Sequence, residues 1–388
     1  MAQLLCFDKL FSVYILSAFL LICPSSLSAD STTPPPSLPG ATVASTPQRT
    51  LAPFAPAARI TSQILSEDTL WRGTVLVDGM VTIAAQATLT IMPGTVVRFG
   101  ADSGILVLGR IVAKGAADLP IILTSTYAEP APSDWYGIVL TGTAKKNIFE
   151  QVHMQGARVA IYARFSSFES KQLQVANSAV ALKLADSIAN LKNLAVSDCP
   201  TGLSSVKSEI ALESVVIERG ETALSVTASS LTATKLTITA SLQVALVAEK
   251  SQLKIEKSDF SGNLSGAMVI GCEGSFSTSK FMTNSDTAVV LSGSLLKFNS
   301  NLVSGNKIGV QLVDNLASIW GNSIYANSRY NLLYLGEDIL YGGGNWFGTA
   351  NPELLQKSLF SKRPGAMQML PFLATDPLSE QPKDFQGR

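Results

Sequence analysis

Charged residues are scarce in this sequence, and neither sign dominates. Lys and Arg together number 29, Asp and Glu also number 29, and no basic stripe or acidic tail occurs. A nucleic-acid groove needs clustered Lys and Arg to release counterions, so the composition excludes a nucleic-acid partner. The low charged fraction, 15% of the chain, is typical of stacked β-structure with neutral polar faces.

Histidine is nearly absent, which limits the chemistry that the chain can perform. His153 is the single histidine, so a zinc site or a Ser-His-Asp triad lacks its partners. No GxSxG elbow is present, and the glycines at 342–344 precede no Lys-Ser/Thr pair of a phosphate-binding loop. We therefore predict no catalytic, cofactor-binding or metal-ligating residue, and no cofactor.

Paired acids are also missing. No Asp-Asp occurs, and the only adjacent acids are Glu67-Asp68 and Glu337-Asp338. Neighbours on a strand point to opposite faces, so we interpret both pairs as turn residues. The other Asp residues fall at scattered positions of the repeat described below, which favours no calcium cluster, although an exposed carboxylate pair between coils stays open.

Long hydrophobic runs are limited to the first residues. The uncharged run Phe11–Cys23 is followed by small residues at 26, 28 and 29, which indicates a signal peptide over 1–29. An uncleaved anchor or lipidation of Cys23 are the alternatives. Residues 30–58 are rich in Pro, Ser and Thr and predict a solvated linker. No later run reaches spanning length, so the sequence predicts an exported bacterial protein, periplasmic or at the cell surface.

A repeat of 21 or 22 residues organises the rest of the chain. A small residue followed by an apolar one recurs at this spacing. We take the small residues as anchors: Ala160, Ala181, Gly202, Ala223, Ala245, Ala267, Ala288, Gly309 and Asn331. Six residues after the anchors stand Ser166, Ser187, Ser208, Ser229, Ser251, Glu273, Ser294, Asn315 and Glu337. An Asn ladder follows in the later repeats: Asn263, Asn284, Asn306 and Asn327.

Such self-similarity indicates a solenoid, in which each repeat buries its face against its neighbours. Leucine-rich repeats share the period, but they need a helical or 3₁₀ segment, and helical spacing is absent here. Three short strands in about 21 residues form one coil of a parallel β-helix. The fold class predicted is all-β, a single-stranded right-handed parallel β-helix of about 12 coils over residues 59–360, followed by a C-terminal tail over 361–388.

The same register separates the two cysteines that remain after the signal peptide. Cys199 precedes the Gly202 anchor, whereas Cys272 follows the Ala267 anchor, more than three coils away. A disulfide requires Cα atoms within about 7 Å. We therefore predict two free, largely buried thiols.

Several stretches resemble a known superfamily. LTIMPGTVVRF (89–99) and PIILTSTYAEPAPSDWYGIVL (120–140) resemble entry coils of bacterial β-helix proteins of the pectin-lyase-like superfamily. GGGNWFGTANPELLQ (342–356) and LPFLATDP (370–377) are similar to its closing coil and tail. The resemblance covers roughly 65–377 and implies the fold. It implies little about activity, because the superfamily holds lyases, polygalacturonases, epimerases, adhesins and members of no assigned activity.

Aromatic residues gather near the C-terminal end of the repeat. They could stack on sugar rings or cap the core, and both interpretations stay open. The candidates for ligand stacking are Trp320, Tyr325, Tyr330 and Tyr334.

A regular solenoid without clustered chemistry favours a non-enzymatic protein. On this hypothesis the chain is a binding or scaffold module of the bacterial envelope, whose partner is a polysaccharide or a surface protein. The alternative is a polysaccharide lyase or glycoside hydrolase of the same superfamily with a divergent site. A passenger or adhesin domain is a third hypothesis.

Overall fold

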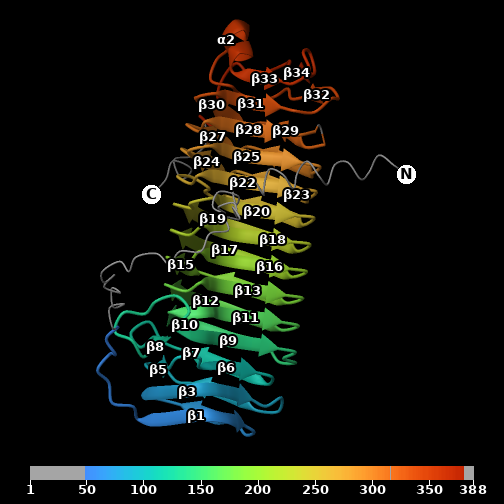
Figure 1. Cartoon of the computed structure of the whole chain (residues 1–388). Coiled ribbons are helices and arrows are strands. Elements are labelled where there is room, and N and C mark those ends of the chain that lie inside the picture. Colours follow the sequence, from blue (N-terminus) through green and yellow to red (C-terminus); the bar gives the residue numbers. More distant parts are fainter. Residues whose placement is uncertain (1–48, 315, 380–388) are drawn as a thin grey trace, which may run out of the picture. The chain divides into compact units, whose positions relative to one another are not determined.

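The described chain is a stack of β-coils. The computed structural model describes residues 49–314 and 316–379, and the predicted signal peptide and most of the predicted linker lie outside them. The fold is an all-β right-handed parallel solenoid, as the sequence predicts, with about 13 turns where about 12 were expected. In Figure 1 the strands lie one above another from the blue first coil to the red last coil. No helix among the described residues is long and apolar enough to cross a membrane.

Each coil contributes a strand to three faces, which we name A, B and C. Face A begins with the second halves of β1 (Ala58–Leu65) and β3 (Thr74–Ile83). It continues through β6 (Gly104–Val107), β9 (Trp135–Thr141), β11 (Ala157–Arg164), β13 (Val180–Ala185), β16 (Thr201–Val206), β18 (Thr222–Thr227), β20 (Val244–Glu249), β22 (Ser265–Ile270), β25 (Thr287–Ser292), β28 (Ile308–Leu312), β31 (Tyr330–Tyr334) and β33 (Leu359–Ser361).

Face B follows face A along the chain in each coil. Its strands, some of which turn a corner into face C, are β2 (Thr69–Trp71), β4 (Thr88–Ile91), β7 (Arg110–Lys114), β10 (Asn147–Gln155), β12 (Ser167–Ala176), β14 (Ile188–Lys192), β17 (Glu209–Glu218), β19 (Ser230–Thr239), β21 (Gln252–Glu256), β23 (Glu273–Ser277), β26 (Leu295–Asn299) and β29 (Ser318–Trp320).

Face C closes the coil and includes the first halves of β1 and β3 and the second halves of β10, β12, β17 and β19. Its separate strands are β5 (Val96–Phe99), β8 (Ile121–Ser125), β15 (Ala195–Ser197), β24 (Lys280–Met282), β27 (Leu302–Ser304) and β30 (Ser323–Tyr325). Near the C-terminal end lie β32 (Leu340–Tyr341), α2 (Pro352–Lys357) and β34 (Met367–Gln368).

Alternation along each strand sends every second side chain into the bore. On face A the residue after each anchor pairs with its equivalent in the next coil, as Leu203 does with Leu224 and Leu224 with Leu246. These residues are buried to 1% exposure or less. The repeated sequence is therefore core packing, stacked like upon like.

The predicted register is wrong by one residue in a single repeat. Leu246 pairs with Ala267, and Ala267 pairs with Val289, so Gly266 is the anchor and Ala267 faces the bore. The added Cβ at position 266 would lie 2.3 Å from the Ala288 carbonyl oxygen, which explains the glycine.

The corrected register places Cys272, rather than Glu273, in the serine ladder between faces A and B. Backbone N–H groups donate to the next Oγ along the ladder, from Ser187 to Ser208 at 3.2 Å and from Ser208 to Ser229 at 3.0 Å. Position 315 is not described, and Glu337 is exposed and pairs with Lys362. The ladder supplies acceptors for buried N–H groups that the sheet does not pair.

The predicted asparagine ladder is confirmed at the corner between faces C and A. Asn263 N–H donates to Asn284 Oδ1 at 3.0 Å, and Asn284 N–H donates to Asn306 Oδ1 at 2.9 Å. A second such ladder, which the sequence analysis did not identify, runs between faces B and C through Asn301, Asn322 and Asn345.

The two cysteines lie at different corners, as the repeat predicts. Cys272 belongs to the corner between faces A and B, and Cys199 lies between faces C and A, where its Sγ donates to the Ser197 carbonyl. Both thiols are free and buried.

Candidate functional site

Face B is hollowed over five consecutive coils, from β14 to β23. A hollow of about 540 Å³ lies over β14, β17 and β19. A second of about 330 Å³ lies over β19, β21 and β23. Thr232 lines both, so the two join into one track that crosses the strands, which we call the face B groove.

Small residues at outward positions create the groove. Asn190 pairs with Ala211, Ala211 with Thr232, and Thr232 with Lys254, so this column of the sheet carries short side chains at its centre. Further along, Gly274 has a φ of +124°, and a Cβ there would lie 1.8 Å from the Leu253 carbonyl oxygen. The glycine is thus required by the backbone and leaves the floor open.

Charged side chains flank this floor. The groove is lined by three lysines and two glutamates: Lys192, Lys235, Lys254, Glu213 and Glu273. Lys192 Nζ lies 2.7 Å from Glu213 Oε2, and the hydrogen bond from Lys192 lowers the pKa of Glu213. Such exposed ion pairs contribute little to stability, so Lys192 can leave Glu213 and pair with a charged ligand at little cost to the fold.

The predicted aromatic candidates do not converge. Trp320 is half exposed on face B, where it stacks in register with Asn299. Tyr325 lies on face C, and Tyr330 lies on face A against the ring of Phe360, with ring centroids 5.2 Å apart. Tyr334 is buried in the bore, where its hydroxyl donates to the Asp338 carbonyl at 2.9 Å. Of the four, Trp320 alone shares a face with the groove.

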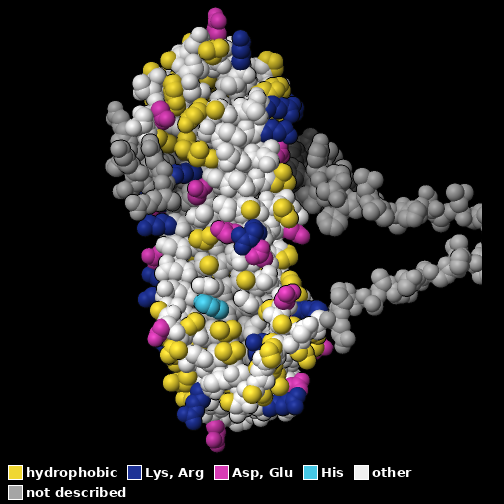
Figure 2. Space-filling view, turned by 90° about the vertical axis from the view of Figure 1, so that its left-hand side faces the viewer, with side chains coloured by type: hydrophobic (Ala, Val, Ile, Leu, Met, Phe, Trp, Pro, Cys, Tyr) yellow, Lys and Arg dark blue, Asp and Glu magenta, His cyan; other side chains and the backbone are white. Residues whose placement is uncertain are grey.

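The single histidine lies beside a smaller hollow on face C. This hollow, of about 100 Å³, is lined by His153, Gln155, Gln174 and their neighbours on β10, β12 and β15. Figure 2 shows the side that carries the histidine, with charges of both signs scattered over it and no large area of one sign. No acid lines the hollow, so it lacks a partner for general acid–base work by His153.

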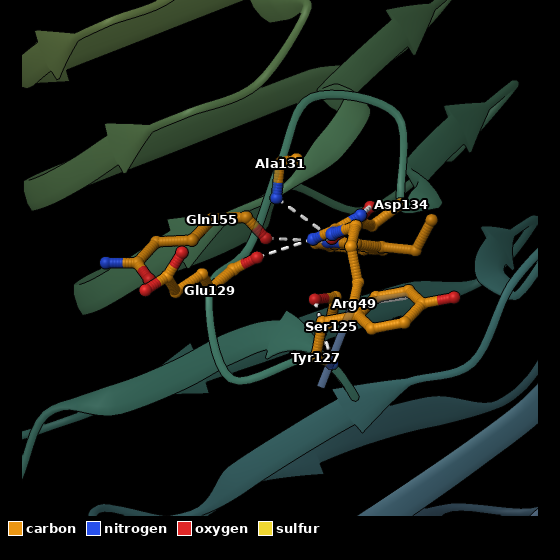
Figure 3. A network of polar contacts seen from close by, with 8 residues as sticks. Arg49, Ser125, Tyr127, Glu129, Ala131, Asp134 and Gln155 are labelled. Atoms are coloured by element: carbon orange, nitrogen blue, oxygen red, sulfur yellow. Dashed lines mark hydrogen bonds and ion pairs between the residues drawn. The ribbon is translucent and has the colours of Figure 1, made fainter. Parts of the chain in front are cut away.

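A polar network next to this hollow ties the start of the described chain to the solenoid (Figure 3). The Arg49 guanidinium binds both carboxylate oxygens of Asp134, with Nη2 2.8 Å from Oδ2, and also donates to the Glu129 carbonyl. It lies over the Tyr127 ring, 4.1 Å from the centroid. Burial raises the pKa of Asp134, but hydrogen bonds from Arg49 and Ala131 outweigh this and lower it. Both oxygens of the Asp134 carboxylate accept hydrogen bonds within the network, which indicates a structural clamp.

Acids elsewhere take part in turns and ion pairs. Asp68 Oδ1 accepts the Thr88 N–H at 2.8 Å. At the corner between faces C and A, Arg219 binds Asp198 through two hydrogen bonds of 2.8 and 3.0 Å. No group of three His, Cys, Asp or Glu able to hold a metal ion occurs within residues 49–314 and 316–379.

Family comparisons identify two β-helix regions in the chain. Residues 62–162 match a family described as a pectate-lyase like β-helix domain, and residues 178–328 match one described as a right handed β-helix region. No curated protein matches the chain.

Solved structures with this fold include two epimerases and a lyase. The A-module of the mannuronan C-5 epimerase AlgE6 from Azotobacter vinelandii is 15% identical, with 75% of this chain and 91% of that one covered, at a TM-score of 0.42. The periplasmic alginate epimerase AlgG is 12% identical, with 78% of each chain covered, at a TM-score of 0.29. An alginate lyase from Paenibacillus sp. str. FPU-7 is 12% identical, with 71% and 93% covered, at a TM-score of 0.26. At these identities the likeness concerns the fold.

The expectation of a non-enzymatic protein is corrected by these comparisons. The domain that residues 62–162 match is named for pectate lyase, an enzyme, so the family comparison does not support a non-enzymatic protein. The inference from a regular, uncharged solenoid was wrong because regularity describes the core, whereas any chemistry depends on outward side chains.

Proposed function

We propose that this chain, a right-handed parallel β-helix protein of the pectin-lyase-like superfamily, is an enzyme that acts on a polysaccharide bound along the face B groove. The observation that carries the proposal is that the two hollows meet at Thr232 and form one track across five coils, flanked by charged side chains. Such a track suits an extended polymer better than a small ligand, because it is open along its length.

The spacing of the coils supports a polymeric ligand. Neighbouring strands lie about 4.8 Å apart, which is close to the length of one sugar residue in an extended chain. A glycan that crosses the strands would therefore place successive sugars over successive coils. Thr232, Gln252 and Asn190 offer hydrogen bonds to hydroxyl groups, and Trp320, further along face B, offers a stacking surface for a sugar ring.

The charges of the groove favour a glycan that carries carboxylates. Lys192, Lys235 and Lys254 outnumber the two glutamates and can pair with sugar carboxylates. For Lys192 and Lys254 these contacts would replace the present ion pairs with Glu213 and Glu256. We assign β-elimination as the reaction. Glu213 would take the proton on the carbon next to a sugar carboxylate, while the Lys192 ammonium stabilises the negative charge that develops. A carbon–carbon double bond then forms as the bond to the leaving sugar oxygen breaks. That oxygen takes up a proton from water, and Glu213 gives its proton to the hydroxide that is left.

The proposed setting is the envelope of a bacterium. It depends on the export signal predicted over 1–29, which lies outside the described residues. Fractionation of cells that express the full chain, followed by sizing of the product, would place it in the periplasm or outside the cell.

The test is turnover on defined polymers. The full chain, matured by export, would be incubated with polygalacturonate, alginate and a neutral glucan, and the ultraviolet absorbance of unsaturated sugar ends would be followed. Turnover is expected on an acidic polymer and none on the glucan. Lys192→Met is expected to lower kcat/KM at least tenfold, about 1.4 kcal/mol.

Lys183→Met is the matched control, because Lys183 is exposed on β13 of face A and lines neither hollow. Equal losses for both lysines would contradict the site. Release of reducing ends without unsaturated product would identify a hydrolase in place of a lyase.

A further inference from the structure

The two ends of the solenoid are closed in different ways. At the C-terminal end α2 and β33 cover the last coils, and Leu355 and Phe347 are buried to 5% and 2% exposure. The tail is held there as well, because Ser323 donates a hydrogen bond to Asp376. The bore is therefore sealed at this end by the chain itself.

The first coil has no comparable cover among the described residues. β1 pairs with β3 and β2 pairs with β4, and neither has a partner on its other side among the described strands. Ile64 and Leu70 are 68% and 55% exposed, and Ile60 and Leu65, which face the bore, are only partly buried. An open edge of this kind is a template for pairing with another chain.

A buried polar group in the same coil is also without a partner. Trp71 is 4% exposed, and its indole Nε1–H makes no hydrogen bond within the structure. Buried N–H groups are almost always paired in a complete structure. The first coil thus leaves a buried hydrogen-bond donor unpaired and bore-facing side chains only partly covered.

The described chain approaches the first coil from the other direction. Arg49 is fixed at Asp134, and Leu51 bridges to Tyr127, beside strands several coils above β1. Residues 49–57 then run down face C, where Phe54 lies over Arg98 and Ala57 N–H donates to the Thr74 carbonyl at 2.8 Å. Arg49, the first described residue, therefore lies beside the loop at 126–134 and not at the open edge.

We propose that the open edge binds a second copy of this chain, so that two first coils meet end to end about a twofold axis. In this arrangement β1 pairs antiparallel with β1 of the second copy, centred between Thr61 and Ser62. Arg59 then lies opposite Ile64, so no like charges face each other across the ladder. A twofold contact of this type needs a self-complementary strand, and β1 meets that requirement.

The charges around the rim also complement one another in such a pair. Arg59 and Asp78 form an exposed ion pair at 3.2 Å, with side chains 64% and 52% exposed. In the dimer, Arg59 of each copy can pair with Asp78 of the other copy in place of its own Asp78. The contact closes after two copies, because the C-terminal ends are sealed and cannot continue a filament.

The test is the mass of the full mature chain in solution. Light scattering during size-exclusion chromatography, over a hundredfold range of concentration, is expected to give twice the chain mass at the upper end. Thr61→Lys would bring two ammonium groups together at the axis and is expected to give the single chain mass throughout. Thr239→Lys, at an outward position on face C far from β1, is the matched control and should keep the dimer.

A cross-linking experiment tests the same contact with a variant that introduces no charge at the axis. Thr61→Cys is expected to form a cross-linked dimer under mild oxidation, since both native thiols are buried. A single chain mass at every concentration, or a dimer unaffected by Thr61→Lys in a folded chain, would overturn the proposal.

Discussion

The thiol of Cys272 accepts a hydrogen bond from the backbone N–H of Ser251, with N and Sγ 3.4 Å apart. Cys272 N–H in turn donates to Ser294 Oγ at 3.1 Å. A cysteine thus occupies a position that serine holds in the coils before and after it. The ladder requires an acceptor at this corner, and a thiol satisfies the same geometry less strongly than a hydroxyl.

The effect of replacing Cys272 on the free energy of unfolding should therefore depend on whether the new side chain accepts a hydrogen bond, and not on its size. Cys272→Ser is expected to leave the free energy of unfolding unchanged or slightly raised. Cys272→Val fills the same space but leaves the Ser251 N–H unpaired, at a cost of about 1–3 kcal/mol. Urea unfolding followed by circular dichroism would measure both. A Val variant as stable as the Ser variant would contradict a ladder role.

Both thiols should be unreactive in the folded protein. Burial raises the pKa of the Cys199 thiol to about 11 and raises that of Cys272 as well. Because the thiolate is the nucleophile, alkylation by iodoacetamide at pH 7.5 is expected to be slow for both residues and to become fast on addition of denaturant. Intact mass before and after unfolding provides the measurement, and rapid labelling of the native chain would contradict it.

The Arg49 clamp is expected to stabilise the first coils. The Asp134 side chain is 6% exposed and that of Arg49 39%, so Arg49→Ala leaves a mostly buried carboxylate without its ion partner. We expect a loss of about 1–2 kcal/mol in the free energy of unfolding. Lys146→Ala, which removes the exposed partner of Glu169, is the matched control and should cost less than about 1 kcal/mol.

The pH dependence of the clamp follows from the lowered pKa of Asp134. A carboxyl whose pKa is lower in the folded state stabilises the fold above its unfolded pKa of about 3.9 and loses this contribution as the pH falls through the folded value. The difference in stability between the natural chain and Asp134→Asn should therefore shrink below about pH 4. Equal differences at pH 3 and pH 7 would contradict the clamp.

The sequence predicted the fold because stacking imposes one residue type on each position of the coil. Its single error of register arose at Gly266-Ala267-Met268, where two small residues precede an apolar one and either can be taken as the anchor. Hydrogen bonding resolves the ambiguity, since Cys272 and not Glu273 continues the ladder. A cysteine flanked by serines at the same spacing is a signal that could have shown this.

The candidate site could not be predicted from the sequence, for a different reason. The face B groove depends on short residues such as Ala211 on β17 and Gly274 on β23, which stacking brings to the same face three strands apart, and no motif marks them. The aromatic candidates failed to gather because they are spaced four or five residues apart, while each coil turns a corner within a similar distance. Trp320, Tyr325 and Tyr330 therefore lie on three faces, and Tyr334 points into the bore.

The acid limit of turnover should reveal whether Glu213 is the proton acceptor. The hydrogen bond from Lys192 lowers the pKa of Glu213, so its basic form persists as the pH falls below the ordinary glutamate value of about 4.3. On an acidic polymer that the chain cleaves, kcat is therefore expected to stay constant from neutral pH down to that value, because Glu213 stays ionised. Lys192→Met removes the cause of the lowered pKa and should move the acid limb to higher pH, while Lys183→Met should leave it in place. Glu213→Gln is expected to abolish turnover at every pH but to keep binding of the polymer, measured by affinity electrophoresis. An unchanged acid limb in Lys192→Met, or turnover by Glu213→Gln, would assign the base to another residue.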